Sequence, residues 1–307
     1  MDWSAAEAPL VATRAVHFAA TAITVGDVIF RTVIVAPVVR SKGAAAEAPS
    51  LWVSWLGLGF AVISGAIWLM LQAASMSGMP LDEAMSSDVL STVINETQFG
   101  QVTTLRAGLA ICLAACLVYN RMAIARRGGF VAALAFAASL AWSGHAGSTT
   151  GEAGYLHLAA DALHLAASAA WIGGLASLVL FLAAACRKKA ISPARDVVRR
   201  FSIMGMVSVA TLLLTGFINA AILVGSVRAL VVTEYGRLLL LKLVLFALML
   251  VLALVNRLVL TPRLAPAGSG ALRWLTGNSA VELALGVAIL TIVGMLGTMH
   301  PAIHLVN

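Results

Sequence analysis

The octet AVHFAATA (residues 15–22) returns far downstream as ALHLAASA (residues 162–169), with a histidine at the same place in each. Five of the eight positions are identical, and the three differences, Val/Leu, Phe/Leu and Thr/Ser, are conservative. Both octets lie in long apolar runs, so His17 and His164 would be ionisable groups inside a membrane, where such side chains face a bundle interior or a cavity. The pair of octets therefore predicts a duplicated membrane fold.

The composition also places the chain in a bilayer. Of its 307 residues, 61% are hydrophobic and only 11% are charged, and the mean hydropathy is +0.98, which is outside the range of soluble domains. At about 20 apolar residues per crossing, we expect an all-α integral membrane protein with eight transmembrane helices, the first of which is retained as its own insertion signal. The predicted spans are residues 10–39, 51–77, 100–120, 129–146, 155–186, 201–225, 236–258 and 279–299.

The charged residues predict how these spans are oriented. Lysines and arginines concentrate in the loops after the odd-numbered spans, which are cytoplasmic by the positive-inside rule. The opposite loops are acidic or nearly uncharged, for example MPLDEAMSSDVLSTVINETQ (residues 79–98). Both termini are therefore expected outside, which is the periplasm if the chain lies in a bacterial inner membrane. The basic residues are Arg40, Lys42, Arg121, Arg126, Arg127, Arg187, Lys188, Lys189, Arg195, Arg199, Arg200, Arg257, Arg263 and Arg273.

The net charge of +7 thus follows from topology. The basic loops lack the interleaved aromatic residues of a nucleic-acid surface, so no nucleic-acid partner is expected. No phosphate-binding loop, dinucleotide fingerprint or nucleophile elbow is present, so we expect neither ATP-driven transport nor an enzyme of those classes. The expected surroundings of the chain are the lipid bilayer.

Further landmarks repeat along the chain. Gly100 precedes Arg106 by six residues, as Gly236 precedes Lys242, and an Asn-Arg pair follows at residues 120–121 and 256–257. His145 ends the fourth span and His300 ends the eighth. We interpret residues 1–128 plus 129–150 as a first four-helix repeat and residues 151–307 as a second, in parallel orientation within one integrated membrane domain. We expect Arg106 and Lys242, near the outer ends of their spans, to extend toward the interface.

The fifth span carries a polar stripe. His157, Asp161 and His164 stand at positions i, i+4 and i+7, within about 60° of one another around a helix. Two imidazoles and a carboxylate on one face can bind a metal, with Asp161 as a ligand or as the acceptor that fixes a histidine tautomer. The alternative is a hydrogen-bonded stripe that holds helices together.

The outer half of the protein also gathers soft ligands. All six histidines are expected there, and the eighth span ends with Met295, Met299, His300 and His304. Met76 and Met79 stand at the outer end of the second span. Thioether and imidazole together suit copper, with sulfur favouring Cu(I) over Cu(II), although methionine also fills gaps in cores.

Haem b is the alternative cofactor, because paired histidines on separate helices of a bundle also bind haem. His17 with His164, or His145 with His300, would be the axial pairs in a membrane redox protein. The copper interpretation gains from the methionines, which haem does not require. The haem interpretation gains from the matched depths of His17 and His164.

Two other charged positions lie within spans. Asp27 and Arg31 stand at i and i+4 in the first span, and they are expected either to pair within the membrane or to line a transport path. Glu282 is expected to be a helix-end residue at the inner end of the eighth span. Cys112 and Cys116 share a helix face, and packing is the expected role for these small side chains.

The chain resembles the copper-resistance D (CopD) family. The resemblance lies in SGHAG (residues 143–147), HLAADALHLAASAAWIGGL (157–175), RFSIMGMVSVATLLLTGFINA (200–220) and EYGRLLLLKLVLFALMLVLALVNR (234–257). It is strongest from the fourth span onward and fainter over the first three. It implies an inner-membrane protein of copper homeostasis that moves copper across the membrane with a separate periplasmic copper carrier of the CopC type.

Overall fold

The computed structural model describes residues 7–42, 51–188 and 191–305, and these residues contain helices and no strand. Eight helical segments are long and apolar enough to span a membrane, which confirms the predicted number. Most boundaries agree within a few residues. The sixth, seventh and eighth spans are extended on their predicted inner side, because helices continue past the apolar stretch that hydropathy detects. The spans are Ala8–Arg40, Trp52–Ser77, Gln98–Val118, Ala123–Ser143, Gly151–Lys188, Ala194–Val224, Glu234–Leu264 and Gly270–Leu296.

Four spans belong to the first half of the chain. The first is continuous but changes helix type, because a π-helical segment separates two α-helices. The fourth ends in a 3₁₀ turn. In order, the elements are α1 (Glu7–Ile29), η1 (Phe30–Val35), α2 (Ala36–Lys42), α3 (Trp52–Ser77), α6 (Gln98–Val118), α7 (Ala123–Ala138) and η3 (Ser139–Ser143).

The other four spans belong to the second half of the chain. Two of its spans again contain π-helical segments, which occur often at functional sites. The elements are α9 (Gly151–Ser168), η4 (Ala169–Gly173), α10 (Gly174–Lys188), α11 (Ile191–Val224), α13 (Glu234–Val255), η5 (Asn256–Leu260) and α14 (Thr261–Leu296).

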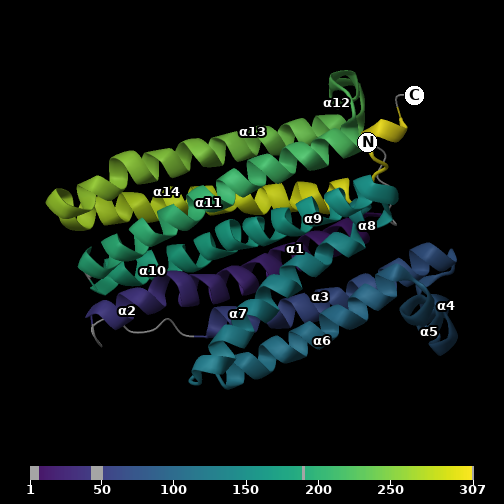
Figure 1. The fold of residues 1–307 in the computed structure, drawn as a ribbon, viewed down its shortest axis with the longest axis horizontal. Helices are drawn as coiled ribbons and strands as arrows, with labels where there is room; N and C mark the ends of the chain where they lie inside the picture. Colours follow the sequence, from purple (N-terminus) through teal and green to yellow (C-terminus); the bar gives the residue numbers. More distant parts are fainter. Residues whose placement is uncertain (1–6, 43–50, 189–190, 306–307) are drawn as a thin grey trace.

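Short helices gather at one end of the bundle, shown on the right of Figure 1, and they include two in the stretch 79–98 that was expected as a loop. The basic connections lie at the opposite end, while the side chain of Lys42 and all of Lys189 fall outside the described residues. We call the end with the short helices the outer end, following the predicted orientation. Its elements are α4 (Leu81–Ala84), α5 (Ser87–Glu96), α8 (His145–Ser148), α12 (Val227–Val232) and η6 (Ala302–His304).

Matched caps begin the third and seventh spans. The Thr97 hydroxyl accepts a hydrogen bond from the Gly100 amide, and the Thr233 hydroxyl accepts one from the Gly236 amide, both at 3.0 Å. A Cβ atom at either glycine would collide with the backbone of the preceding short helix. The Thr-x-x-Gly spacing therefore fixes a sharp entry into each helix, and it supports the predicted duplication.

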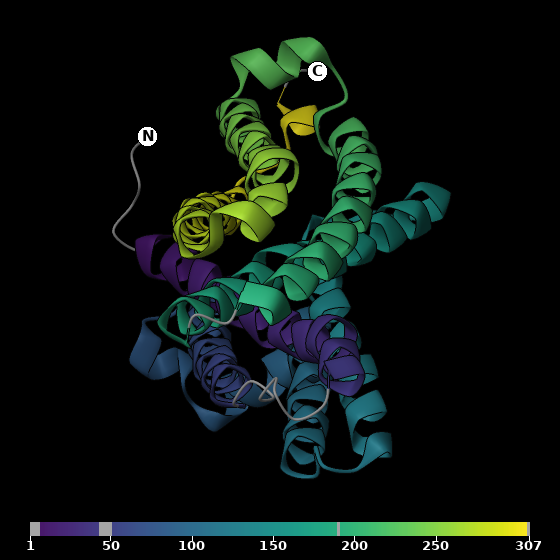
Figure 2. The same cartoon turned by 90° about the vertical axis from the view of Figure 1, so that its left-hand side faces the viewer.

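The two halves meet where their first spans cross. Gly26 lies nine residues after His17, Gly173 lies nine residues after His164, and these two glycines contact each other directly. Glycine allows the backbones of membrane helices to approach closely. Figure 2 shows the purple α1 between the blue helices of the first half and the green and yellow helices of the second.

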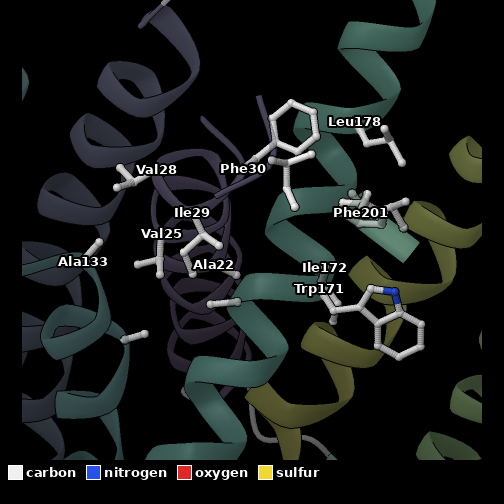
Figure 3. Close-up of a cluster of buried hydrophobic side chains, with 14 of the residues drawn as sticks. Ala22, Val25, Val28, Ile29, Phe30, Ala133, Trp171, Ile172, Leu178 and Phe201 are labelled. Carbon is white, nitrogen blue, oxygen red and sulfur yellow. The ribbon is translucent and has the colours of Figure 1, made fainter. Parts of the chain in front are cut away.

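Aromatic and aliphatic side chains pack around this crossing (Figure 3). Phe30 is fully buried and contacts Phe181 and Phe201 edge-on, with ring centroids 6.2 and 6.3 Å apart. Within lipid such contacts stabilise through close packing rather than through removal of apolar surface from water. Burial falls away from this centre, from 61% of the most apolar window in the first span to 22% in the sixth and 11% in the seventh. Helices α11 and α13 therefore present most of their surface outward, toward lipid.

Candidate functional site

His17 is held by hydrogen bonds at both ring nitrogens. Its Nδ1 lies 3.1 Å from Ser64 Oγ, and its Nε2 lies 2.9 Å from Arg106 Nη2. A guanidinium can only donate, so Nε2 is the acceptor and Nδ1 carries the proton. The Ser64 hydroxyl donates its own hydrogen bond to the Phe60 carbonyl at 2.6 Å. With both nitrogens engaged, this imidazole has no lone pair to offer a metal.

Arg106 is buried, and the expectation that it extends to the interface is wrong. Its guanidinium also donates to the Phe136 carbonyl (2.6 Å), Ser139 Oγ (2.8 Å) and Thr21 Oγ1 (3.1 Å). It is 6% exposed. Four acceptors from α1, α7 and η3 draw the side chain inward, because an unpaired charge inside a membrane is costly. Arg106 therefore joins the helices of the first half.

A second arginine lies one turn above His17. The buried Arg14 guanidinium stacks over Trp68 at 4.8 Å and occupies the space where a side chain at Gly297 would stand. Gly297 follows the last residue of α14, and a cation is favourable at that end of a helix dipole. The surroundings of His17 thus carry two positive charges.

His164 has a different environment. Its Nδ1 lies 2.9 Å from Thr215 Oγ1, and the Thr215 hydroxyl donates a hydrogen bond to the Thr211 carbonyl at 2.6 Å. Nδ1 must therefore be the donor, which leaves the lone pair on Nε2. Within residues 7–42, 51–188 and 191–305, this Nε2 has no hydrogen-bond partner. Lys242, the equivalent of Arg106, has no hydrogen bond to this ring among the described residues, although its charge acts on the ring. The Nε2 lone pair of His164 is therefore unoccupied.

The neighbours of the two histidines differ in charge. Arg14 stands three residues before His17, whereas Asp161 stands three residues before His164. The carboxylate of Asp161 accepts a hydrogen bond from Asn219 Nδ2 at 3.1 Å and lies within Coulombic range of Lys242. The second half therefore places an anion where the first half places a cation.

His157 offers another free nitrogen nearer the outer end. Its Nδ1 lies 2.8 Å from Thr149 Oγ1, which donates to the His145 carbonyl at 3.1 Å. Nδ1 is again the donor, and in the part of the chain that the structure describes Nε2 has no partner. The His145 ring lies close enough to interact electrostatically with His157, and its Nε2 is 3.3 Å from the Leu296 carbonyl. Residues of both halves thus meet here.

The structure spreads the other predicted ligands over the outer end. Met295 and Met299 pack against α12 and α13, and His300 is exposed. Met76 and Met79 are exposed at the α3–α4 end, on the flank opposite η6 (Figure 1). His304 belongs to η6, but its side chain lies outside the described residues. Among the described residues, no three His, Cys, Asp or Glu side chains converge to hold a metal ion.

The predicted haem pairs are also separate. His17 is bonded to α3 and α6, whereas His164 is bonded to α11. His145 contacts Tyr235 with ring centroids 6.3 Å apart, while His300 is exposed. The geometry does not join either pair around one iron atom.

Asp27 joins three helices at the crossing. Ser54 on α3 donates to its Oδ2 at 2.5 Å, and Ser177 on α10 donates to its Oδ1 at 2.8 Å. Arg31 lies within Coulombic range, as the spacing predicts. Two hydroxyl donors satisfy this buried carboxylate, which favours a structural role over a path-lining role.

Sequence reasoning missed the residues that set these environments. Ser64 and Thr215, each followed by glycine, hold the two histidines, and Trp68 and Asn219 stand four residues after them. The sequence signal lies in the span that follows each octet, where ISGAIW (63–68) aligns with LTGFIN (214–219). This alignment pairs Ser64 with Thr215 and Trp68 with Asn219. Thr149 and Tyr235 carry no such signal.

Comparisons with known proteins agree with the resemblance in the sequence. The family model described as Copper resistance protein D matches residues 195–296, and the one described as Copper resistance protein D-like, N-terminal domain matches residues 5–155. The second match covers the first three spans, where the resemblance is fainter. No protein of solved structure gives a significant match.

Three curated relatives are similar over most of this chain. Inner membrane protein YebZ of Escherichia coli (strain K12) is 30% identical over 77% of this chain and 82% of its own length. Copper resistance protein D of Pseudomonas syringae pv. tomato is 30% identical over 80% and 81%. Copper transport protein CutJ of Bacillus subtilis (strain 168) is 28% identical over 76% of this chain, which spans 42% of that protein. The chain therefore belongs to the copper resistance D family of multi-span membrane proteins.

Proposed function

We propose that this protein takes copper at the outer end of its second half and passes it inward across a bacterial inner membrane. The observation that carries the proposal is the contrast between the two matched histidines. His17 has no free nitrogen and is flanked by two arginines, whereas His164 has a free Nε2 and stands three residues after Asp161. The first environment carries two positive charges, whereas the second carries one, on Lys242, and the carboxylate of Asp161 offsets it. A metal cation is therefore repelled less by the second environment than by the first.

The proposed path contains two successive copper-binding sites rather than one closed site. His157 and His164 are seven residues apart on a continuous helix, about 10.5 Å at 1.5 Å per residue, so they cannot bind the same ion. Copper would bind first near His145 and His157, then at His164 and Asp161. Weak sites in series allow an ion to enter and also to leave, which suits transport better than storage.

Soft ligands at the outer end would receive the metal. Met295 and Met299 pack in the cluster that contains Tyr235, and the ring of Tyr235 contacts His145. Thioether groups favour Cu(I), and His300 follows Met299 in the chain. The family resemblance supports delivery by a separate periplasmic carrier of the CopC type, and the predicted orientation places both termini in the periplasm with it.

The test is metal content. Detergent-purified protein from cells supplied with copper and iron is analysed for both elements per chain. The double substitution His157→Ala and His164→Ala should remove most of the bound copper. His17→Gln, the matched control at the other octet, keeps one donor and one acceptor and should retain it.

Two results would contradict the proposal. Unchanged copper in the double variant, with monodisperse protein on size exclusion, would remove both histidines from the path. Iron near one atom per chain without copper would support the haem alternative and an electron-transfer role. Copper flux into proteoliposomes then separates transport from binding alone, since protein-free vesicles give the background rate.

A further inference from the structure

Glu282 is a buried carboxyl group in the middle of a membrane span. The prediction that Glu282 is a helix-end residue is wrong, because α14 begins at Thr261 and its apolar span runs from Gly270 to Leu296. The side chain is 2% exposed. An ionisable residue at this depth is a candidate for function by default.

Two polar side chains face this carboxyl group, and each comes from a π-helical segment. Asn256, the first residue of η5, donates from Nδ2 to Glu282 Oε2 at 3.0 Å. Trp171, in the middle of η4, lies close enough for its indole N–H group to interact with the same carboxyl group. Figure 3 shows the Trp171 ring directed away from the α1 core residues and toward α14. One carboxyl group thus links the irregular turns of two spans to α14.

The asparagine is itself oriented by α14. Asn278, one turn before Glu282, donates to Asn256 Oδ1 at 2.7 Å and to the Leu252 carbonyl at 3.3 Å. Because the Asn256 oxygen is already an acceptor for Asn278, its amide NH₂ group must point at Glu282. This arrangement suits a carboxylate, which can only accept.

A cavity reaches the carboxyl group from the inner half of the bundle. Its volume is about 140 Å³, enough for several water molecules. It lies among α10, η4, α11, α13, η5 and α14. Its wall runs from Val209 and Leu250 near mid-membrane to Ser202, Arg257 and Thr261 on the inner side.

The carboxyl group has no cationic partner among the residues that the structure describes. Arg257 is the cation among the residues lining the cavity, and its Nη1 donates to Ser202 Oγ at 3.0 Å instead. The remaining groups that face Glu282 from η4, η5 and α14 are the neutral Trp171, Asn256 and Ser279. A carboxylate without a counter-ion at the end of a cavity is positioned to gain and lose a proton.

We propose that Glu282 is a proton-binding site, reached through this cavity from the inner side, whose charge controls how tightly η4 and η5 are held against α14. The step is the addition of one proton to one carboxylate oxygen, and it needs no co-reactant. Ionised Glu282 accepts a charge-assisted hydrogen bond from Asn256 and attracts the indole N–H group of Trp171, and protonation weakens both interactions. The proton site rests on the proposed transport function in one respect. That function gives the proton its use, which is to make the inner half of the copper path sensitive to pH.

The first experiment detects the proton itself. Infrared spectra of the full chain in lipid bilayers are recorded across a pH series for the wild type, Glu282→Gln and Glu83→Gln, a matched control at an exposed glutamate of α4. The C=O stretch of a buried carboxylic acid is separate from that of solvated groups. The wild-type minus E282Q difference should contain one titrating C=O band, and the wild-type minus E83Q difference should lack it.

The second experiment measures the consequence for transport. Copper flux into proteoliposomes is recorded while the pH on the inner-end side is varied. Flux of the wild type should change by up to about tenfold per pH unit, the limit for one linked proton, and flux of E282Q should change less than about twofold.

The outcomes separate the two proposals. A titrating band without copper flux in the wild type leaves the proton site standing and overturns transport. Flux that is equally pH-dependent in E282Q, or a titrating band that persists in that variant, overturns the proton site and leaves transport standing.

Discussion

Replacing Arg106 with methionine tests whether this arginine holds the first half together. The substitution keeps an unbranched chain but removes four hydrogen bonds, to Phe136, Ser139, His17 and Thr21. Measured hydrogen bonds inside membranes average about 0.6 kcal/mol and reach about 1.7 kcal/mol. Four of them give about 2 to 7 kcal/mol. We expect about 4 kcal/mol, because the charge strengthens each bond while the released hydroxyls find other acceptors.

The assay is reversible unfolding of the purified chain in mixed micelles, followed by circular dichroism. The matched control is Arg237→Met, which removes an exposed arginine of α13 bonded only to two carbonyls of the preceding short helix. This change should alter the free energy of unfolding by less than about 0.5 kcal/mol. A loss below about 1 kcal/mol for R106M, or equal losses for both variants, would refute the reasoning.

Two further experiments address the crossing and the orientation. Gly173→Val should prevent α1 and η4 from meeting and abolish monodisperse protein on size exclusion. Gly108→Val, at a glycine with open space beside it, should leave the protein monodisperse. Folded G173V protein would contradict the close approach. In a chain from which the native cysteines are removed, Arg187→Cys should react only with reagents on the cytoplasmic side and Met79→Cys only with reagents outside, and the opposite pattern would invert the predicted topology.

The number and extent of the spans could be predicted because they depend on local composition. Twenty apolar residues in a row are sufficient for a crossing, so hydropathy located all eight. It did not find the start of α14, since residues 261–269 are not apolar and yet continue the helix. The position of Glu282 within its span was therefore misjudged. The short helices α4 and α5 were missed for a similar reason, because their composition resembles that of a loop.

The chemistry of the histidines could not be predicted from the octets alone. His17 and His164 have nearly the same neighbours along the chain, and they differ through Arg106, Ser64 and Thr215, which lie on other helices. Whether a ring nitrogen is free is a property of packing between distant segments. The exchange of Arg14 for Asp161 was visible in the aligned sequence, but its meaning required knowing which side chains surround each histidine.

The central position of α1 has a consequence for how the chain is made. Gly26 leaves the ribosome about 150 residues before its partner Gly173, which at about 5–20 residues per second is a delay of about 7–30 s. During that interval Gly26 lacks its partner on η4, and the Asp27 side chain lacks the hydrogen bond that Ser177 on α10 later donates. The newly inserted α1 must therefore be sheltered by other first-half helices or by the insertion machinery until the second half of the chain arrives.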